Sequence, residues 1–270
     1  MKLLLHRPRL ALVLLAVIVL APGPLLLRLT LDNAPEAYFP KESPSVRFND
    51  SVREDFPLDQ VVLALFEGEE IYGDDVLARI DALVEDLQAD ERVERVLAAT
   101  TVDHIRATAD GFTVDRLLAV DDGLSAAARR ARAQADRLAA GSIIAEEGAA
   151  MAVVLRPWPM ESSLERLEVE QLLRQAVAAN GLEPWLTAVA GHIALDVAQL
   201  RSMLRDVATL VPGTLGISLL LLWWLFRRGL VLAISTGVIS AVTGFAVALL
   251  VVLGKPFTLI TAIVPPLLTA

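Results

Sequence analysis

The pattern of hydrophobic and polar positions divides the chain into apolar segments near its two ends and a mixed middle. Crossing about 30 Å of hydrocarbon takes roughly 20 helical residues. Residues 207–226 and 229–253 carry no charged side chain and meet this length, so we expect two membrane-spanning helices. Only Arg227 and Arg228 separate them, which predicts a helical hairpin with a tight turn.

Two shorter apolar segments need separate interpretation. Residues 10–27 are favoured as a retained first span, because a signal peptide cut after Ala21 would leave Pro22 at the new N-terminus and the apolar run resumes beyond it. A cleaved signal peptide is the alternative. Residues 256–270 are too short to cross, so we interpret this segment as the start of an unfinished fourth helix.

Residues 57–190 alternate between strand patterns and helix patterns. Short apolar runs rich in β-branched residues predict four strands, at 61–66, 93–102, 151–155 and 186–190. Two helices are predicted from apolar residues at helical spacing: one begins at Asp74 and Asp75, and the other at a capping box of Ser162 and Glu165. The order strand, helix, strand, strand, helix, strand predicts the βαββαβ arrangement of a ferredoxin-like sandwich.

An insertion at 104–147 separates the two middle strands. It contains an alanine-rich helix, predicted at 124–140, that carries Arg129, Arg130, Arg132 and Arg137. These arginines fit a contact with anionic lipid or an acidic partner, or a solvated helix face, which we favour. Asp121-Asp122-Gly123 lacks the alternating ligands of a calcium loop and is predicted to be a turn. Beyond the last strand, an amphipathic helix at 192–206 is predicted to continue directly into the second span.

Charge is distributed unevenly along this pattern. All 33 acidic residues lie between Asp32 and Asp206, which leaves a net charge of −15 over residues 10–206 and +6 outside them. Basic residues in short loops stay in the cytoplasm, which places the N-terminus and the Arg227-Arg228 turn inside and the acidic block outside. The predicted divisions are a tip and first span at 1–28, an extracytoplasmic domain at 29–206, and membrane helices at 207–270. Such an acidic domain argues against nucleic-acid binding.

Residues with the chemistry of common active sites are scarce. The chain has no cysteine, and its three histidines, His6, His104 and His192, lie far apart without metal-ligand spacing. Hydrolase, nucleotide-binding and zinc-protease motifs are missing from the sequence. We therefore expect no catalytic, cofactor-binding or metal site and no enzyme activity. Residues 207–270 contain no Asp, Glu or His, so this segment offers no intramembrane acid for proton transfer.

Small residues recur in the third apolar segment, at Gly237, Ser240, Ala241, Gly244 and Ala248. Small residues four apart let helices approach closely in lipid. The same pattern also arises simply because Gly and Ala are common in membrane spans. The two interpretations weigh equally on the sequence alone.

Four local motifs follow one another along the chain. They are Asn49-Asp50 through Phe56-Pro57, Val189-Ala190-Gly191, Phe226-Arg227-Arg228-Gly229, and the run from Thr258 to Pro266. Together with the order of the predicted spans, they resemble the N-terminal part of the resistance-nodulation-division (RND) superfamily, and more narrowly the MmpL-type exporters that include hopanoid and lipid transporters. The resemblance covers nearly the whole chain and rests on the order of motifs and spans.

The resemblance implies an α-helical membrane protein of the bacterial inner membrane with an α+β, porter-type domain between its first and second spans. It implies part of a proton-driven exporter of lipids or other hydrophobic compounds, whose proton-relay acids would follow Ala270. The implied partners are membrane lipids, a hydrophobic or lipid substrate, and further copies of the chain or accessory periplasmic proteins. A membrane-anchored sensor or assembly factor that binds a lipid or protein without transport is the alternative function.

Overall fold

The computed structural model describes residues 8–32, 43–55, 60–108, 111–160, 162–258 and 260–269. The chain divides into two compact units. The first, called here the helix unit, comprises residues 1–46, 162–164 and 198–270, and the second, the sheet unit, comprises 47–161 and 165–197. Each unit is described below by itself.

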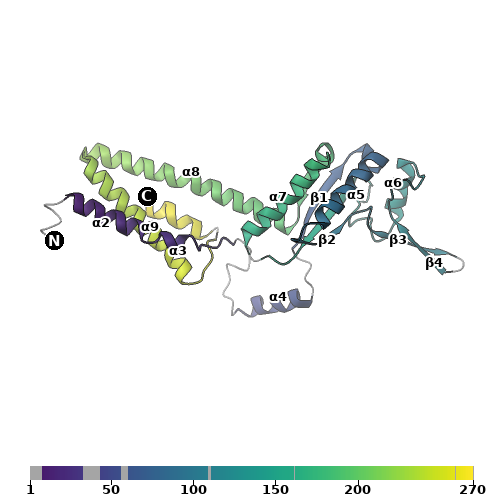
Figure 1. The fold of residues 1–270 in the computed structure, drawn as a ribbon, viewed down its shortest axis with the longest axis horizontal. Coiled ribbons are helices and arrows are strands. Elements are labelled where there is room, and N and C mark those ends of the chain that lie inside the picture. The colour runs from purple at the N-terminus through teal and green to yellow at the C-terminus, as the bar shows by residue number, and fades with distance from the viewer. Residues whose placement is uncertain are drawn as a thin grey trace. The chain divides into compact units, whose positions relative to one another are not determined.

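A four-stranded sheet is the centre of the sheet unit (Figure 1). Its strands are β1 (Val62–Glu67), β2 (Val93–Leu97), β5 (Ala150–Pro157) and β6 (Leu186–Ala190), arranged in the order β2-β5-β1-β6. Every neighbouring pair is antiparallel. Strands β5 and β1 are therefore central. The connections from β1 to β2 and from β5 to β6 each pass over one intervening strand.

Two helices supply the apolar partners of this sheet. Helix α5 (Asp74–Gln88) and helix α7 (Ser163–Ala179) contribute buried aliphatic residues to the same core as the strands. On β1 the alternate residues Val62, Ala64 and Phe66 are fully buried, as expected when one face of a strand packs against helices. The sheet and these helices therefore form a layered α+β core.

The predicted order of these strands and helices is confirmed. Helix α5 begins at Asp74, α7 begins directly after Ser162, and Gly181 lies just beyond the end of α7 with a φ of +64°, which suits a glycine after a helix. The second strand is shorter than predicted and ends at Leu97. Beyond it Thr101 Oγ1 accepts a hydrogen bond from the Ala98 N–H at 3.0 Å. This hydrogen bond holds residues 98–101 in a turn, which takes the place of the rest of the predicted strand.

Gly191 ends β6 where the chain approaches β1 very closely. Its φ is +102°, and a Cβ atom there would lie 2.6 Å from the Val61 carbonyl oxygen. Any other residue would clash with backbone rather than with a side chain that can move aside. Gly191 is therefore required at the junction between β6 and the helix that follows.

The insertion contains a hairpin that the sequence analysis did not predict. Strands β3 (Asp103–Thr108) and β4 (Gly111–Arg116) form a separate two-stranded antiparallel sheet. Helix α6 (Ala126–Ala135) follows and is shorter than the predicted 124–140. It ends because Asp136 takes an extended backbone conformation and its Oδ1 accepts from the backbone N–H groups of Leu138 and Ala139. The predicted turn at Asp121–Gly123 is confirmed, since both terminal residues have positive φ.

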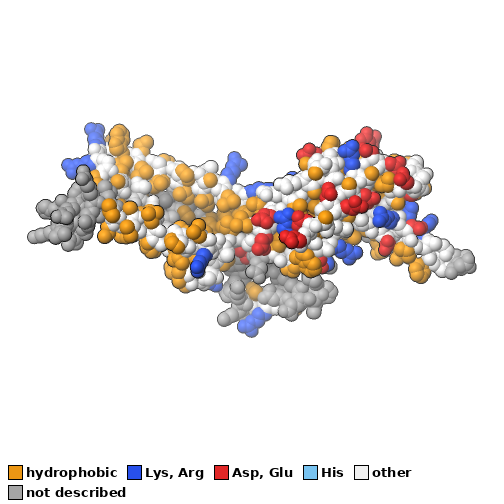
Figure 2. Space-filling model, viewed as in Figure 1, with side chains coloured by type: hydrophobic (Ala, Val, Ile, Leu, Met, Phe, Trp, Pro, Cys, Tyr) orange, Lys and Arg blue, Asp and Glu red, His pale blue; other side chains and the backbone are white. Residues whose placement is uncertain are grey.

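Among the described residues of the helix unit, two helices are long and apolar enough to span a membrane. They are α8 (His192–Phe226), whose first residues belong to the sheet unit, and α9 (Gly229–Val252), and their ends agree with the predicted turn at Arg227-Arg228. Hydrophobic side chains dominate the visible surface over α8 and α9, whereas Asp and Glu gather over the sheet unit (Figure 2). As predicted, α8 runs without a break from 192 into the second apolar segment.

The first apolar segment is shorter in the structure than in the prediction. Helix α2 (Pro8–Leu20) ends at a turn containing Pro22, and a one-turn helix, α3 (Gly23–Leu26), follows. Beyond α9 the described residues include a β-bridge between Phe257 and Leu31 and short helical segments, among them α10 (Val264–Thr269). The remaining helical elements are α4 (Pro44–Asp55), with Asn49-Asp50 inside it, and the 3-10 turns Glu69–Tyr72, Glu183–Trp185 and Thr261–Ile263.

Small residues mark the contact between α9 and the first apolar segment. A Cβ atom at Gly237 would lie 2.4 Å from Leu15 Cδ2, and one at Gly244 would lie 3.0 Å from Pro22 Cγ. Ala241 and Ala248 of α9 are buried as well. These four positions lie three or four residues apart and share one helix face, whereas Ser240, the fifth predicted position, is exposed. Close approach therefore describes four of the five small residues.

Candidate functional site

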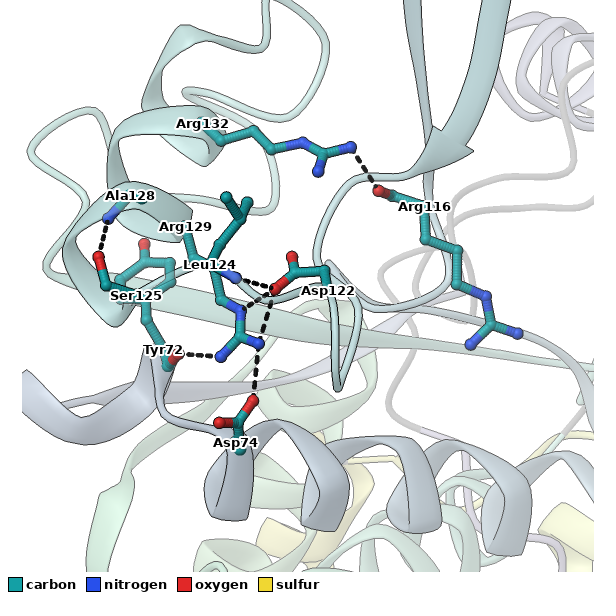
Figure 3. A network of polar contacts seen from close by, with 9 residues as sticks. All are labelled: Tyr72, Asp74, Arg116, Asp122, Leu124, Ser125, Ala128, Arg129 and Arg132. Atoms are coloured by element: carbon teal, nitrogen blue, oxygen red, sulfur yellow. Dashed lines mark hydrogen bonds and ion pairs between the residues drawn. The ribbon is translucent and has the colours of Figure 1, made fainter.

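Arg129 of α6 is the centre of a buried ionic cluster (Figure 3). Its side chain is 2% exposed. Arg129 Nε donates to Asp122 Oδ1 at 2.9 Å, Nη2 donates to Asp74 Oδ1 at 2.6 Å, and Nη1 donates to the Tyr72 carbonyl oxygen at 3.2 Å. One guanidinium therefore joins helix α6, the turn before it, and the start of helix α5.

Local structure holds the acceptors of this cluster in place. Asp121 and Gly123 adopt φ values of +64° and +71°, which turn the chain sharply around Asp122. The Asp122 carboxylate is fixed by a bond of 3.0 Å from the Leu124 N–H. Ser125 then caps α6 by accepting from the Ala128 N–H at 3.3 Å. The turn and the cap together aim the carboxylate at the second turn of the helix, where Arg129 lies.

Electrostatics keep both partners of this ion pair charged. Burial by itself raises the pKa of Asp122, but hydrogen bonds from Arg129 and from the Leu124 N–H outweigh it, and the pKa lies below the ordinary value of 3.8. The hydrogen bond with Asp122 is the main cause that raises the pKa of Arg129. The cluster is thus a permanent ion pair between neutral and mildly acidic pH.

The arginines of α6 correct a prediction. A helix face in contact with solvent or anionic lipid does not describe Arg129, which is buried. Its neighbours also bind their own chain: Nη2 of the exposed Arg130 donates to the Glu147 carbonyl at 2.6 Å, and Nη2 of the half-buried Arg132 donates to the Arg116 carbonyl at 2.9 Å. These two arginines tie α6 to the end of β4 and to Glu147 at the end of the insertion.

A second polar contact anchors the hairpin. His104 Nδ1 of β3 lies 2.6 Å from Asp136 Oδ2, and both side chains are largely buried. Burial raises the pKa of Asp136, but hydrogen bonds from His104 and from the Ala139 and Leu138 N–H groups outweigh burial. The pKa of Asp136 therefore lies below the ordinary value of 3.8. An ionised carboxylate can only accept, so the hydrogen between them belongs to His104 Nδ1. The contact joins β3 to the end of α6.

A third ionic pair is buried between α7 and the start of α8. Arg166 Nη1 donates to Asp196 Oδ2 at 3.0 Å, and the two side chains are 5% and 3% exposed. Arg166 Nη2 also donates to the Met160 carbonyl at 3.2 Å. The sequence analysis identified neither partner, because their separation of thirty positions matches no local pattern. Only packing of the two helices brings them together.

These clusters are suited to holding structure rather than to chemistry. Among the described residues there is no group of three His, Cys, Asp or Glu side chains able to hold a metal ion. Of the three histidines, His6 lies outside the described residues, His104 binds Asp136, and His192 is the first residue of α8. Among the described hydrogen bonds His104 is paired with the Asp136 carboxylate, and this pair acts as an anchor.

No protein-family model matches the chain, and no curated protein matches it by sequence.

Proposed function

We propose that this chain is the N-terminal part of a proton-driven exporter of the RND superfamily, of the MmpL type, that moves lipids or other hydrophobic compounds. The observation that carries the proposal is the sheet order β2-β5-β1-β6 with antiparallel neighbours. Its two helix crossovers each pass over one strand, as they would in a ferredoxin-like sandwich, and this supports the proposal. This unit lies in the sequence between an apolar N-terminal helix and two helices of spanning length.

In this proposal the sheet unit is extracytoplasmic and receives the substrate. Its acidic surface suits a domain that faces water, and the basic turn Arg227-Arg228 suits the cytoplasmic side. The chain would then be a multi-pass protein of a bacterial inner membrane. The apolar contact between α9 and Leu15 and Pro22 supports a packed membrane bundle, because small residues replace the missing hydrophobic drive between helices in lipid.

The topology is testable because the chain has no cysteine. We expect a cysteine in place of Ala131, exposed on α6, to react with a membrane-impermeant maleimide in intact cells. A cysteine in place of Gly229, where a Cβ atom meets no neighbour, should react only after the cells are permeabilised. Labelling of both positions in intact cells would contradict the proposed orientation.

Transport itself is tested on the gene. We expect the reading frame to continue past codon 270 and to place an Asp or Glu in a following apolar span. Replacing that acid by Asn or Gln should abolish proton-coupled movement of a hydrophobic dye in inverted vesicles, while leaving insertion unchanged. A stop directly after Ala270, or a continuation without an intramembrane acid, would contradict an exporter.

One observation favours a second candidate function. From 207 to 270 the sequence contains no Asp, Glu or His, so these residues supply no proton pathway by themselves. A membrane-anchored sensor or assembly factor needs none. It would bind a lipid or protein with the sheet unit and would show no dye movement in the vesicle assay.

A further inference from the structure

The β3–β4 hairpin has two chemically different faces. In the register of the hairpin Asp103 pairs with Arg116, Ile105 with Val114, and Ala107 with Phe112. Cross-strand partners point to the same side of a sheet, and successive residues alternate sides. Ile105, Val114 and Phe112 therefore share one face, called here the apolar hairpin face, with Asp103 and Arg116 at its base.

The opposite face of the hairpin is polar and already occupied by its own contacts. His104 binds Asp136 there. Arg106 Nη2 donates to Asp115 Oδ2 at 3.1 Å, with both side chains in solvent. Nothing in this face requires a partner, because its charged groups are either paired with each other or hydrated.

The apolar hairpin face is exposed in the described part of the chain. Ile105 is 61% exposed, Val114 50% and Phe112 72%. The hairpin forms its own two-stranded sheet and extends away from the four-stranded sheet of the same unit (Figure 1). A two-stranded hairpin is marginally stable in water by itself, and three large apolar side chains on one face gain free energy when they are covered.

We propose that the apolar hairpin face is a dimer interface that is covered by the same face of a second copy of this chain. The argument is charge complementarity. If two hairpins stack face to face around a two-fold axis parallel to their strands, β3 of one copy lies opposite β4 of the other. Asp103 then faces the second copy's Arg116, and Arg116 faces its Asp103.

The same operation also matches the apolar positions. Ile105 faces Val114 of the second copy, and Phe112 faces the position of Ala107. A large residue thus stands opposite a small one, which allows two stacked faces to interdigitate at the usual spacing of about 10 Å. Arg116 is available for this contact, since its side chain is 60% exposed and its ion pair with Asp81 Oδ2 is long at 3.9 Å.

The charge pairs provide the decisive test, made on the full chain in detergent and in lipid nanodiscs. We expect the wild-type chain to be a dimer by light scattering. Asp103→Arg and Arg116→Asp should each weaken dimerisation about tenfold or more, because each places like charges opposite one another twice. Mixing these two variants should restore a dimer that contains one copy of each, since every facing pair is then opposite in sign.

The mixing experiment separates the interface from effects within one hairpin. Each single variant keeps its own unfavourable cross-strand pair after mixing, so recovery can come only from contact between copies. Single variants that remain dimeric, or a mixture that stays monomeric, would overturn the proposal. Circular dichroism and thermal unfolding of each variant establish that it is folded.

Cross-linking tests the same interface without altering its charges. A mixture of the Ile105→Cys and Val114→Cys proteins should be joined efficiently by a short bismaleimide that spans about 10 Å. A mixture of Ile105→Cys with Thr113→Cys, which lies on the polar face, should not be joined. Equal cross-linking in both mixtures would overturn face-to-face stacking.

Other occupants of the face appear as distinct outcomes. A wild-type chain that is monomeric at tens of micromolar in both media would overturn a second copy as the partner. If a fluorophore on Phe112→Cys then shifts to the blue on addition of phosphatidylglycerol vesicles, the face binds a lipid surface instead. The dimer proposal does not depend on the proposed transport function, since the vesicle assay can fail while the charge-swap result holds.

Discussion

In the sheet unit, Arg129 and Arg166 are buried against carboxylates, whereas in the helix unit α9 meets the first apolar segment through Gly237 and Gly244. The sheet unit can bury apolar side chains away from water and adds ion pairs where its loops and helices join. If the helices of the helix unit lie in a membrane, as proposed, they cannot gain in that way, because lipid is as apolar as their side chains. They depend on close contact, and each unit is therefore sensitive to a different kind of substitution.

The largest effect is expected at the buried pair of α7 and α8. Asp196→Asn removes the charge that compensates Arg166, and breaking a buried ion pair costs about 3–5 kcal/mol. Loss of protection in hydrogen exchange of the β1 and β5 amides measures the change. The matched control is Asp75→Asn, which breaks the exposed pair with Arg79 and should cost about 0.5 kcal/mol. Equal costs would show that burial of the first pair has no energetic consequence.

The next effect is expected at the centre of the ionic cluster. Arg129→Met fills a similar volume but leaves Asp122 without its main partner, and we expect a loss of about 3 kcal/mol. Faster hydrogen exchange should be confined to α6 and the start of α5. Arg130→Met, in the same helix but exposed, should cost about 1 kcal/mol or less. A comparable loss for the two variants would contradict the structural role assigned to Arg129.

A smaller effect is expected in the helix unit, where the substitution adds a methyl group instead of removing a charge. Gly237→Ala places a methyl group against Leu15 and should cost about 1–3 kcal/mol by overpacking. Thermal unfolding in detergent measures this, and Leu15→Ala in the same chain should restore part of the loss. Gly213→Ala, where a Cβ atom meets no neighbour, should instead be neutral or gain about 1 kcal/mol from helix propensity. If both glycine variants behave alike, the close contact is not a stabilising one.

The smallest effect is a pH dependence at the anchor of the hairpin. The hydrogen bonds of Asp136 hold its pKa in the folded chain below the ordinary value of 3.8, so the unfolded chain binds this proton more readily. The contribution to stability is therefore complete above pH 3.8 and is lost as the pH falls through the lower, folded value. Unfolding curves at a series of acid pH values should show a shallower acid loss for Asp136→Asn than for the wild type.

Much of the architecture could be predicted because its signals are local. The βαββαβ order of elements followed from short β-branched runs and from apolar residues at helical spacing. The starts of α5 and α7 and the turn between α8 and α9 followed from acidic residues, a capping box and the two arginines of the turn. The hairpin β3–β4 escaped prediction because His104, Arg106 and Asp115 interrupt its apolar positions. Helix α6 was predicted too long, because Asp136 ends it through hydrogen bonds that alanine content does not reveal.

The sequence by itself determined which segments are apolar enough to span a membrane and in what order strands and helices follow, since hydrophobic periodicity and chain length act within a single element. Only the tertiary structure decided which charges are buried and which small residues touch a neighbour. Asp74 and Arg129 are 55 positions apart, and Leu15 and Gly237 are still further apart. Such pairs meet only because the whole fold packs them together, and their separation along the chain follows no local sequence pattern.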